Sequence, residues 1–286
     1  MSITPTQLPL VPKMKKDLML SLLAEGRRID NRKLDEPRKI EIVTNYAERA
    51  NGSALVKLGE TLVLAGIKLE LGAPFPDTPD EGVLIVNAEF VPIASPFFEP
   101  GPPDENAAEL ARVIDRSLRA GKTLDLKALA LIPGSRVLVV WCDLYIMSHA
   151  GNLIDAASLA AMSALATTRL PKLEMSGNSV KLIRGSRDKC LEIKNWVVTS
   201  TVAKIGDYFV ADPNDEEEAV ADVRFTIAFN KSGEVVGAQK AGFGALTLRE
   251  IDEALDLAWK TAVKYFAQLE SSLDTQKCTS GDAVAG

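Results

Sequence analysis

The sequence predicts an α/β (α+β) fold in which one β/α unit occurs twice, forming mixed sheets with helices packed on them. Two similar segments support this duplication: residues 56–65 (VKLGETLVLA) and residues 203–212 (AKIGDYFVAD). Both place a lysine, an aliphatic residue, a glycine and an acid ahead of β-forming residues, which is typical of a strand, a tight turn and a second strand. Lys57 and Lys204 occupy matching positions, so we interpret them as marks of the duplication rather than as site residues.

The first half begins with a short lead-in helix and continues as sheet. A basic pair followed by an apolar stripe that ends at Gly26 predicts the helix. Residues 53–58 and 61–67 are rich in β-formers and are separated by a Gly-Glu link, which suits a hairpin. Residues 83–91 continue as strand, so the first half opens with a sheet.

After a proline-rich stretch, a helix is expected to begin near Asp104 or Glu105. Residues 136–147 predict a buried strand, and residues 155–168 predict an alanine-rich helix that can approach the sheet closely. In the second half, the capping-box pattern at 247–250 (TLRE) starts another long helix, which runs to about Leu269. The predicted organisation is a lead-in segment at 1–30, a first half at 31–170, a linker at 171–195, a second half at 196–270 and a disordered tail at 271–286.

Length and composition indicate a globular protein. The chain has 286 residues, of which 47% are hydrophobic and 25% are charged. The apolar run near the start, residues 18–23, is too short to span a bilayer, and no small-residue cleavage site follows it. We therefore expect a cytoplasmic protein that does not contact a membrane.

Few residues are available for metal, disulfide or histidine chemistry. Cys142, Cys190 and Cys278 show no CxxC spacing and are odd in number, which argues against a disulfide framework and against a zinc site. His149 is the single histidine, so multi-histidine metal sites are excluded, and we expect it in a turn or an interface. We expect no bound cofactor and no metal.

Residues 109–119 (ELARVIDRSLR) predict a helix with an unusual charged side. Arg112, Arg116 and Arg119 fall on one exposed side of this helix. The opposite, apolar side comprises Ala107, Leu110, Ala111, Ile114 and Leu118. Because the formal net charge of the chain is −6, nucleic-acid binding must come from a local basic patch, and these arginines are the candidates.

Three segments resemble a known family, the RNase PH-type phosphorolytic exoribonucleases. Residues 51–66 (NGSALVKLGETLVLAG) resemble the first hairpin of that family, and residues 27–40 (RRIDNRKLDEPRKI) resemble its N-terminal arginine segment. Residues 99–119 (EPGPPDENAAELARVIDRSLR) are more similar to one branch, the RNase PH-like subunit of the archaeal exosome that lacks catalytic residues. The resemblance covers roughly residues 10–270.

The resemblance implies a duplicated RNase PH-type fold and a place in an RNA-degrading complex. It implies a hexameric ring, a trimer of heterodimers, in which this chain alternates with a catalytic RNase PH-like exosome subunit. RNA-binding cap proteins are implied as further partners, and single-stranded RNA as the ligand.

The resemblance also draws attention to a loop in which catalytic relatives hold phosphate with a glycine, a serine or threonine and an arginine. The corresponding residues here are 149–155 (HAGNLID). Gly151 is retained, but Leu153 stands where a guanidinium is needed, and Asp155 is expected to bring a negative charge to the anion site. The sequence therefore predicts a poor phosphate site and no catalytic residues in this chain.

An acidic segment, residues 212–222 (DPNDEEEAVAD), allows two interpretations. Catalytic relatives carry paired acids in this turn and an aspartate a few residues later, whereas here three glutamates precede Asp222 with shorter spacing. Such a carboxylate cluster can bind Mg²⁺. We favour the other interpretation, a solvated acidic turn between strands, because runs of charge usually face water.

The arginine helix also allows two interpretations. In the first, nearby acids hold the arginines in ordinary surface ion pairs. The candidate partners are Glu109, Asp115, Asp104 and Glu105. In the second, which we favour, the exposed guanidinium groups bind RNA phosphates, with Arg112 and Arg116 contributing more than Arg119.

These observations predict a non-catalytic exosome subunit that binds single-stranded RNA and helps to structure the 3′→5′ phosphorolytic active site of its partner. The alternative is that the chain is itself an active phosphate-dependent 3′→5′ exoribonuclease. That alternative requires another arginine near Asn152 and Leu153, because phosphate binding needs a cation there.

Overall fold

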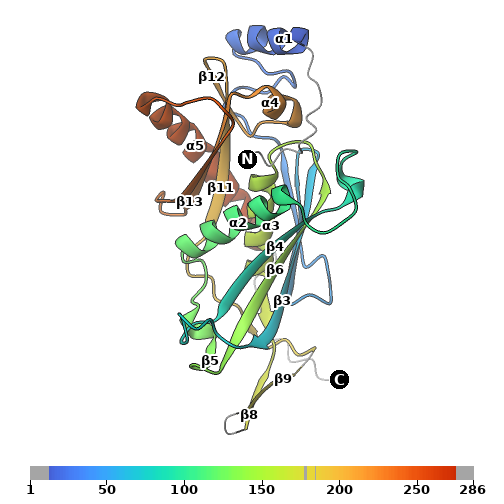
Figure 1. Ribbon diagram of the computed structural model, residues 1–286, viewed down its shortest axis with the longest axis vertical. Coiled ribbons are helices and arrows are strands. Elements are labelled where there is room, and N and C mark those ends of the chain that lie inside the picture. Colours follow the sequence, from blue (N-terminus) through green and yellow to red (C-terminus); the bar gives the residue numbers. More distant parts are fainter. Residues whose placement is uncertain (1–12, 177–178, 184, 275–286) are drawn as a thin grey trace.

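The structure is a computed structural model that describes residues 13–176, 179–183 and 185–274. Two sheets, one from each half of the chain, pack against a layer that contains α2 (Glu105–Ala120) and α3 (Leu153–Ala166), as Figure 1 shows. The predicted α/β fold, with mixed sheets and helices packed on them, is therefore confirmed.

The first sheet is mixed. In spatial order its strands are β1 (Ile40–Thr44), β2 (Gly52–Leu58), β3 (Thr61–Gly72), β6 (Arg136–Ser148) and β4 (Val83–Phe90), with β5 (Ala130–Ile132) paired to β6. Strand β4 runs parallel to β6, and the other pairs are antiparallel. Two 3₁₀ turns lie in its connections, η1 (Pro92–Ala94) and η2 (Lys127–Leu129).

The second sheet is antiparallel throughout. Its strands are β12 (Tyr208–Ala211), β11 (Val197–Ile205), β13 (Val223–Asn230) and β14 (Val235–Ala241), and the helices of this half are α4 (Asp215–Val220) and α5 (Leu248–Asp274). The β2–β3 and β11–β12 hairpins turn at Gly59 and Gly206, both with a φ of 60°, which glycine adopts without strain. The two segments that the sequence predicts as repeats thus form equivalent hairpins.

Helix α3 lies at the centre of the molecule. Every residue from Leu153 to Leu165 is buried, because α3 packs on β2 and β3 with one side and on β11 with another. Its small alanines allow these close approaches on several sides. The loop that precedes α3 therefore lies where the two halves of the chain meet.

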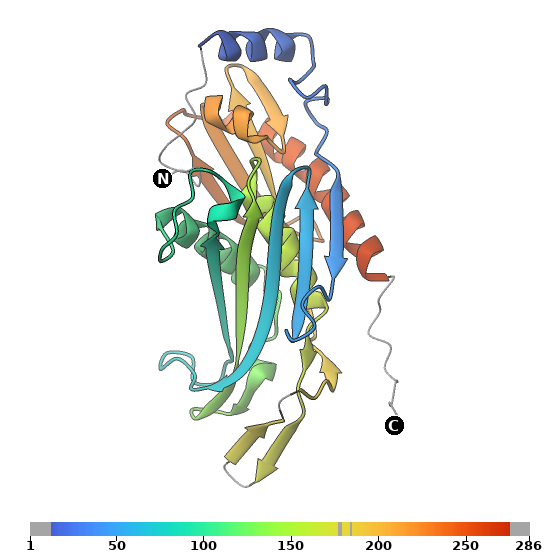
Figure 2. The same ribbon diagram turned by 90° about the vertical axis from the view of Figure 1, so that its right-hand side faces the viewer.

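The N-terminal helix α1 (Lys13–Ala24) confirms the predicted lead-in helix and packs on the second half. Met19 and Leu23 are buried in a small cluster with Ala203, Ile205 and Val210. Figure 2 shows α1 at the top of the molecule, beyond the strands of the second sheet. Within the part of the chain that the structure describes, no helix is long and apolar enough to cross a membrane.

The predicted linker at 171–195 contains strands. Strand β7 (Arg169–Leu170) pairs with β10 (Lys189–Cys190), and β8 (Leu173–Ser176) pairs with β9 (Ser179–Leu182). The β8–β9 hairpin projects from the lower end of the molecule in Figure 2. The break in periodicity that marks this segment in the sequence thus corresponds to short strand pairs between the halves.

The cysteines and the last helix add to what the sequence predicted. Cys190 is disulfide-bonded and Cys142 is a free, buried thiol, whereas the sequence argued only against a disulfide framework. Helix α5 continues to Asp274, past its expected end, and residues 275–286 of the expected tail, including Cys278, lie outside the described residues.

Candidate nucleic-acid interface

Helix α2 places the arginine side chains on one exposed side. Its apolar side is buried, with Leu110 and Ile114 fully inaccessible. Asp104 caps the helix, since its side chain accepts a hydrogen bond from the backbone N–H of Ala107 at 2.8 Å. The helix packs on β4 of the first sheet and β14 of the second, so its outer side runs along the junction between the halves (Figure 1).

The three arginines of α2 differ in their partners. Arg119 donates from Nε to Asp115 at 2.8 Å and also donates to the backbone carbonyl of Leu84. Arg112 and Arg116 are exposed, and neither forms a hydrogen bond or an ion pair with the residues that the structure describes. Two guanidinium groups on this helix are thus available to bind a ligand, and the third is already held.

Three of the four acids proposed as partners of these arginines have other contacts. Glu109 accepts a hydrogen bond from Nε2 of Gln239 at 3.0 Å, which links α2 to β14. Asp115 pairs with Arg119, and Asp104 caps the helix. Among the described residues, no ion pair neutralises Arg112 or Arg116.

The loop before α3 is closely packed and does not form an open site for an anion. Gly151 has a φ of 88°, and a Cβ atom added to it would lie 2.3 Å from the backbone of Asn214. Leu153 is 3% exposed and belongs to the main hydrophobic core. The glycine therefore serves the close approach of the two halves, and the leucine fills the core where catalytic relatives need a cation.

Asp155 lies in the first turn of α3 and is fully buried. Its carboxylate accepts hydrogen bonds from the backbone N–H of Thr201 at 2.8 Å and from the hydroxyls of Thr201 and Thr199 at 2.9 and 3.0 Å. Burial raises the pKa of Asp155 to about 6. The sequence predicted an acid whose charge reaches an anion site; the structure instead encloses this carboxylate against β11, because α3 packs on that strand.

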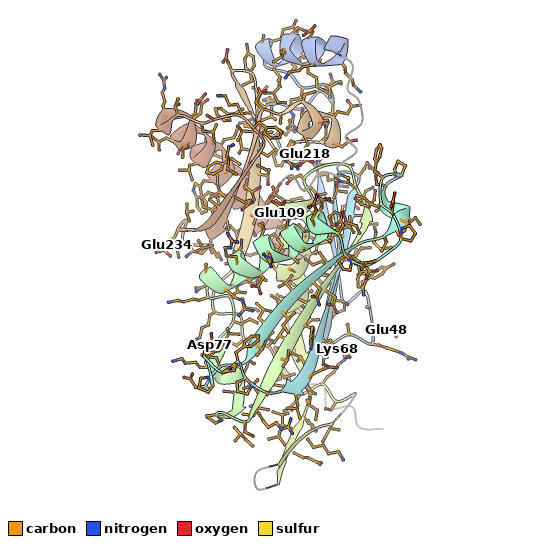
Figure 3. All side chains as sticks on the ribbon, viewed as in Figure 1. Glu48, Lys68, Asp77, Glu109, Glu218 and Glu234 are labelled. Atoms are coloured by element: carbon orange, nitrogen blue, oxygen red, sulfur yellow. The ribbon has the colours of Figure 1, made fainter. Side chains whose placement is uncertain are left out.

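A small cavity lies beside the same loop, with a volume of about 10 Å³, room for a single water molecule. Glu109 and Glu218, labelled in Figure 3, line it from α2 and α4. Glu109 Oε2 and Asn152 Oδ1 are buried there without a hydrogen-bond partner among the described residues. These atoms accept hydrogen bonds, so they suit a donor such as water and disfavour phosphate.

The cations near this cavity do not change that conclusion. Arg224 pairs with Glu218 through Nη1 at 2.9 Å. His149 also lines the cavity, and burial lowers its pKa, which favours the neutral ring near pH 7. The cavity thus lacks the free positive charge that phosphate binding requires.

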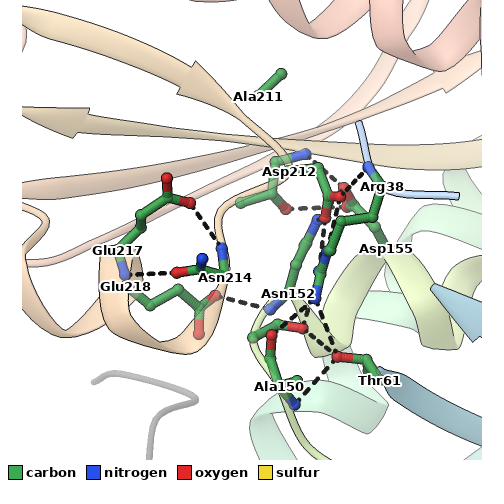
Figure 4. Close-up of polar contacts among 12 residues, drawn as sticks. Arg38, Thr61, Ala150, Asn152, Asp155, Ala211, Asp212, Asn214, Glu217 and Glu218 are labelled. Atoms are coloured by element: carbon green, nitrogen blue, oxygen red, sulfur yellow. Dashed lines mark hydrogen bonds and ion pairs between the residues drawn. The ribbon is translucent and has the colours of Figure 1, made fainter. Parts of the chain in front are cut away.

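The acidic segment is only partly solvated: Asp215 is exposed, but Asp212, Glu217 and Glu218 are buried, so the prediction of a solvated turn is wrong for these three acids. Asp212 and Glu217 are 0% and 2% exposed. The Arg38 guanidinium group donates two hydrogen bonds to the Asp212 carboxylate, from Nη2 at 2.7 Å and from Nε at 2.9 Å (Figure 4). Burial acts to raise the pKa of Asp212, but the charge and hydrogen bonds of Arg38 outweigh it and hold the pKa below its usual value.

A second buried pair joins the same two segments. Arg28 donates from Nε to Glu217 at 2.8 Å and from Nη1 to the Ala211 carbonyl at 2.7 Å. Both charged side chains are almost completely buried. The arginine segment near the N-terminus therefore neutralises the acidic segment of the second half, which sequence reasoning missed. The opposite charges of the two segments were the available signal.

These contacts involve the acids that the sequence offered as Mg²⁺ ligands. The carboxylates of Asp212, Glu217 and Glu218 each face an arginine. No group of three or more histidine, cysteine, aspartate or glutamate side chains among the described residues has an arrangement suited to a metal ion. The sequence left Mg²⁺ binding by this segment open, and the structure uses the same acids in ion pairs.

Comparison with known families matches both halves of the chain. The profile of the 3′ exoribonuclease family, domain 1, matches residues 36–171. The profile of the 3′ exoribonuclease family, domain 2, matches residues 195–261.

Close relatives align over almost the full chain. The protein named exosome complex component Rrp42 from Sulfurisphaera tokodaii is 49% identical over 274 residues, which is 96% of this chain and 100% of the relative. The protein of the same name from Aeropyrum pernix is 51% identical over 274 residues, covering 96% of this chain and 99% of the relative.

Solved structures agree with these relatives. A chain of the Archaeoglobus fulgidus exosome with RNA bound to the active site superposes with a TM-score of 0.80 at 42% identity, covering 89% of this chain and 97% of that chain. A chain of an archaeal exosome core superposes with a TM-score of 0.78 at 39% identity, covering 90% of this chain and 96% of that chain. The duplicated hairpins, the two profile matches and these relatives together show that the chain belongs to the 3′ exoribonuclease family, the RNase PH family.

Proposed function

We propose that this chain is a non-catalytic ring subunit of an exosome, which binds single-stranded RNA and helps to structure the 3′→5′ phosphorolytic active site of a catalytic RNase PH-like partner. The relatives that align over nearly the whole chain are named exosome components, which supports the assembly. In this proposal the ring is a trimer of heterodimers, cap proteins that bind RNA attach to it, and the complex acts in the cytoplasm.

The observation that carries the non-catalytic assignment is the loop before α3. Phosphorolysis needs a cationic site that holds inorganic phosphate beside the terminal RNA linkage. Here Leu153 is in the core, and the adjacent cavity holds about one water molecule and is lined by unpaired acceptor atoms. Neither the space nor the charge of this site suits phosphate.

The RNA-binding assignment depends on Arg112 and Arg116. Exposed guanidinium groups form paired hydrogen bonds with phosphate oxygens, and their charge attracts the RNA backbone in an otherwise acidic protein. Both side chains are exposed and unpaired in the described part of the chain, so no ion pair must break before RNA binds. Arg119 contributes less in this proposal because Asp115 already holds it.

The test is the release of nucleoside diphosphates from a short single-stranded RNA in phosphate buffer. Three samples are compared: this chain alone, a catalytic RNase PH-like exosome subunit alone, and the mixture. We expect no release by this chain and more release by the mixture than by the partner alone. Release by this chain alone, lost when phosphate is omitted, would establish the alternative, an active exoribonuclease.

A further inference from the structure

The connection between β4 and α2, residues 91–104, is called the proline loop here (VPIASPFFEPGPPD). It contains five prolines, which fix the backbone φ angles and reduce the number of conformations available to it. It lies beside the start of α2 and projects from the right-hand side of the molecule in Figure 1. It is also part of the segment that most resembles the non-catalytic branch of the family, yet neither phosphate nor RNA binding explains it.

The base of the proline loop is firmly anchored. The ring of Phe98 is buried and stacks between Phe90, at 4.8 Å between ring centres, and His149, at 5.7 Å. The backbone N–H of His149 donates to the carbonyl of Ala94 at 3.1 Å. Asp104 ends the loop as the cap of α2. The loop is thus fixed at both ends and in the middle.

Two large apolar side chains point outward from this anchored base. Ile93 is 80% exposed and Phe97 is 39% exposed. Exposed apolar side chains on a rigid frame suit binding, because little conformational entropy is lost when a partner covers them. Two exposed apolar side chains within five residues of an anchored loop suit a protein-binding surface.

The charge around the proline loop favours a protein over RNA. From Val83 to Ala111 the chain has five acids and no lysine, arginine or histidine. Glu89, Glu99 and Glu105 are exposed. Carboxylates repel RNA phosphates but attract a basic protein surface, and exposed acids close in sequence to exposed apolar side chains suit the polar rim of a protein interface.

We propose that the proline loop docks into an apolar recess bordered by lysine or arginine on the catalytic partner subunit, with Ile93 and Phe97 entering the recess and Glu99 and Glu105 pairing with its rim. This inference rests on the proposed function, since it assumes that the chain assembles with such a partner. It assigns RNA binding and partner binding to neighbouring segments, the arginines of α2 and the loop that precedes that helix.

The test measures the affinity of this chain for a catalytic RNase PH-like exosome subunit by titration calorimetry, and the size of the assembly by light scattering. Ile93→Ser with Phe97→Ser is compared with a matched control, Tyr46→Ser with Phe75→Ser, which removes two apolar side chains that are 56% and 49% exposed elsewhere on the first half. We expect the loop variant to lose roughly tenfold or more in affinity, and the control to bind as the parent chain does. Thermal unfolding should be unchanged in both variants because the substituted side chains are exposed.

A second variant tests the charges of the rim. Glu99→Lys with Glu105→Lys should weaken association, and added salt should weaken the parent complex but not that of the variant. Parent-like affinity in the loop variant, or equal losses in the loop and control variants, would overturn the docking inference while leaving the ring proposal intact. A parent chain that does not associate at all would overturn the proposed function. If the loop variant assembles normally but its rings bind RNA more weakly, the loop contacts RNA instead.

Discussion

Two groups of arginines in this chain have opposite surroundings. Two arginines of the N-terminal arginine segment lie at the junction of the halves: Arg28 is buried and binds Glu217, and Arg38, whose side chain is 9% exposed, binds Asp212. Arg112 and Arg116 on α2 are exposed, and neither has such a partner among the described residues. The same side chain therefore serves folding in one place and is left free for a ligand in the other.

The difference lies in what surrounds each guanidinium group. A buried charge is costly unless it is paired and hydrogen-bonded, and Arg28 meets a carboxylate and two backbone carbonyls within the core. Near α2, Asp104 caps the helix, Glu109 binds Gln239 and Asp115 pairs with Arg119. Arginine content alone thus cannot separate a structural arginine from a binding one; the position of the carboxylates does.

The largest expected effect on stability comes from breaking the ion pair between Arg38 and Asp212. Asp212→Asn keeps the shape of the side chain, and asparagine tolerates the φ of 48° found there, but the change leaves Arg38 buried without its counter-charge. We expect the free energy of unfolding to fall by about 3–5 kcal/mol, measured by denaturant titration. Lys39→Ala, which removes an exposed pair with Glu41, is the control and should cost less than about 1 kcal/mol. Equal losses in the two variants would contradict the role of the buried pair.

Asp155 is also a buried carboxylate at the junction, but it has no arginine partner. Hydroxyl and amide groups form hydrogen bonds with it instead. Its pKa is raised to about 6 in the folded chain, above the ordinary value of 3.8. The folded state therefore holds a proton that the unfolded state releases as the pH rises from about 4. Relative to Asp155→Asn, the parent chain should lose roughly 1.4 kcal/mol of stability per pH unit between about pH 4 and 6, with no further loss above about 7.

Unfolding free energies of the parent chain and of Asp155→Asn, measured across this pH range, check that prediction. The difference between the two curves isolates Asp155 from Asp212, whose lowered pKa acts in the opposite direction and reduces stability as the pH falls. Parallel curves would show that Asp155 does not hold its proton at these pH values.

The smallest expected change is in the free energy of RNA binding, when the exposed arginines Arg112 and Arg116 are replaced. Arg112→Ala with Arg116→Ala in the assembled ring should weaken single-stranded RNA binding by roughly tenfold and lower the salt dependence by about 0.7 for each lost phosphate contact. Stability should stay within about 0.5 kcal/mol of the parent, unlike the Asp212 variant. Fluorescence anisotropy across a salt series measures both the affinity and its salt dependence.

The control for this experiment is Arg119→Ala, which should change RNA affinity little because Asp115 and the Leu84 carbonyl already hold that guanidinium group. Unchanged affinity and unchanged salt dependence in the double variant would show that Arg112 and Arg116 do not bind RNA. Equal effects of the double variant and of Arg119→Ala would show that the ion pair with Asp115 does not protect Arg119 from RNA.

Much of the fold was predictable because local patterns determine local structure. The hairpins turn at Gly59 and Gly206 as expected, and α2 begins after Asp104 as its capping residue indicates. The glutamate of the predicted capping box at the start of α5 accepts a hydrogen bond from the Thr247 backbone at 2.8 Å. In each case the residues that determine the feature are neighbours in the sequence.

The site was predictable only in part. The exposed side of α2 follows from helical periodicity, and Leu153 in place of a cation is visible in the sequence. Whether Arg112 has an acid within reach depends on rotamers and on β14, which lies more than a hundred residues later in the chain. The burial of Asp212 and Glu217 was mispredicted because a run of charges normally faces water, and their partners Arg38 and Arg28 come from the N-terminal part of the chain.

The sequence by itself determined the duplicated fold, the arginine side of α2 and the lack of a cation at residue 153, because periodicity, capping and residue type act over a few positions. Only the tertiary structure decided which charges are neutralised. Ion pairs form between side chains that the packing of α3 and the two sheets brings together, as Arg38 and Asp212 show across 174 positions of sequence. The same packing encloses Asp155, buries Asp212 and Glu217 and leaves two arginines of α2 without a partner in the described chain.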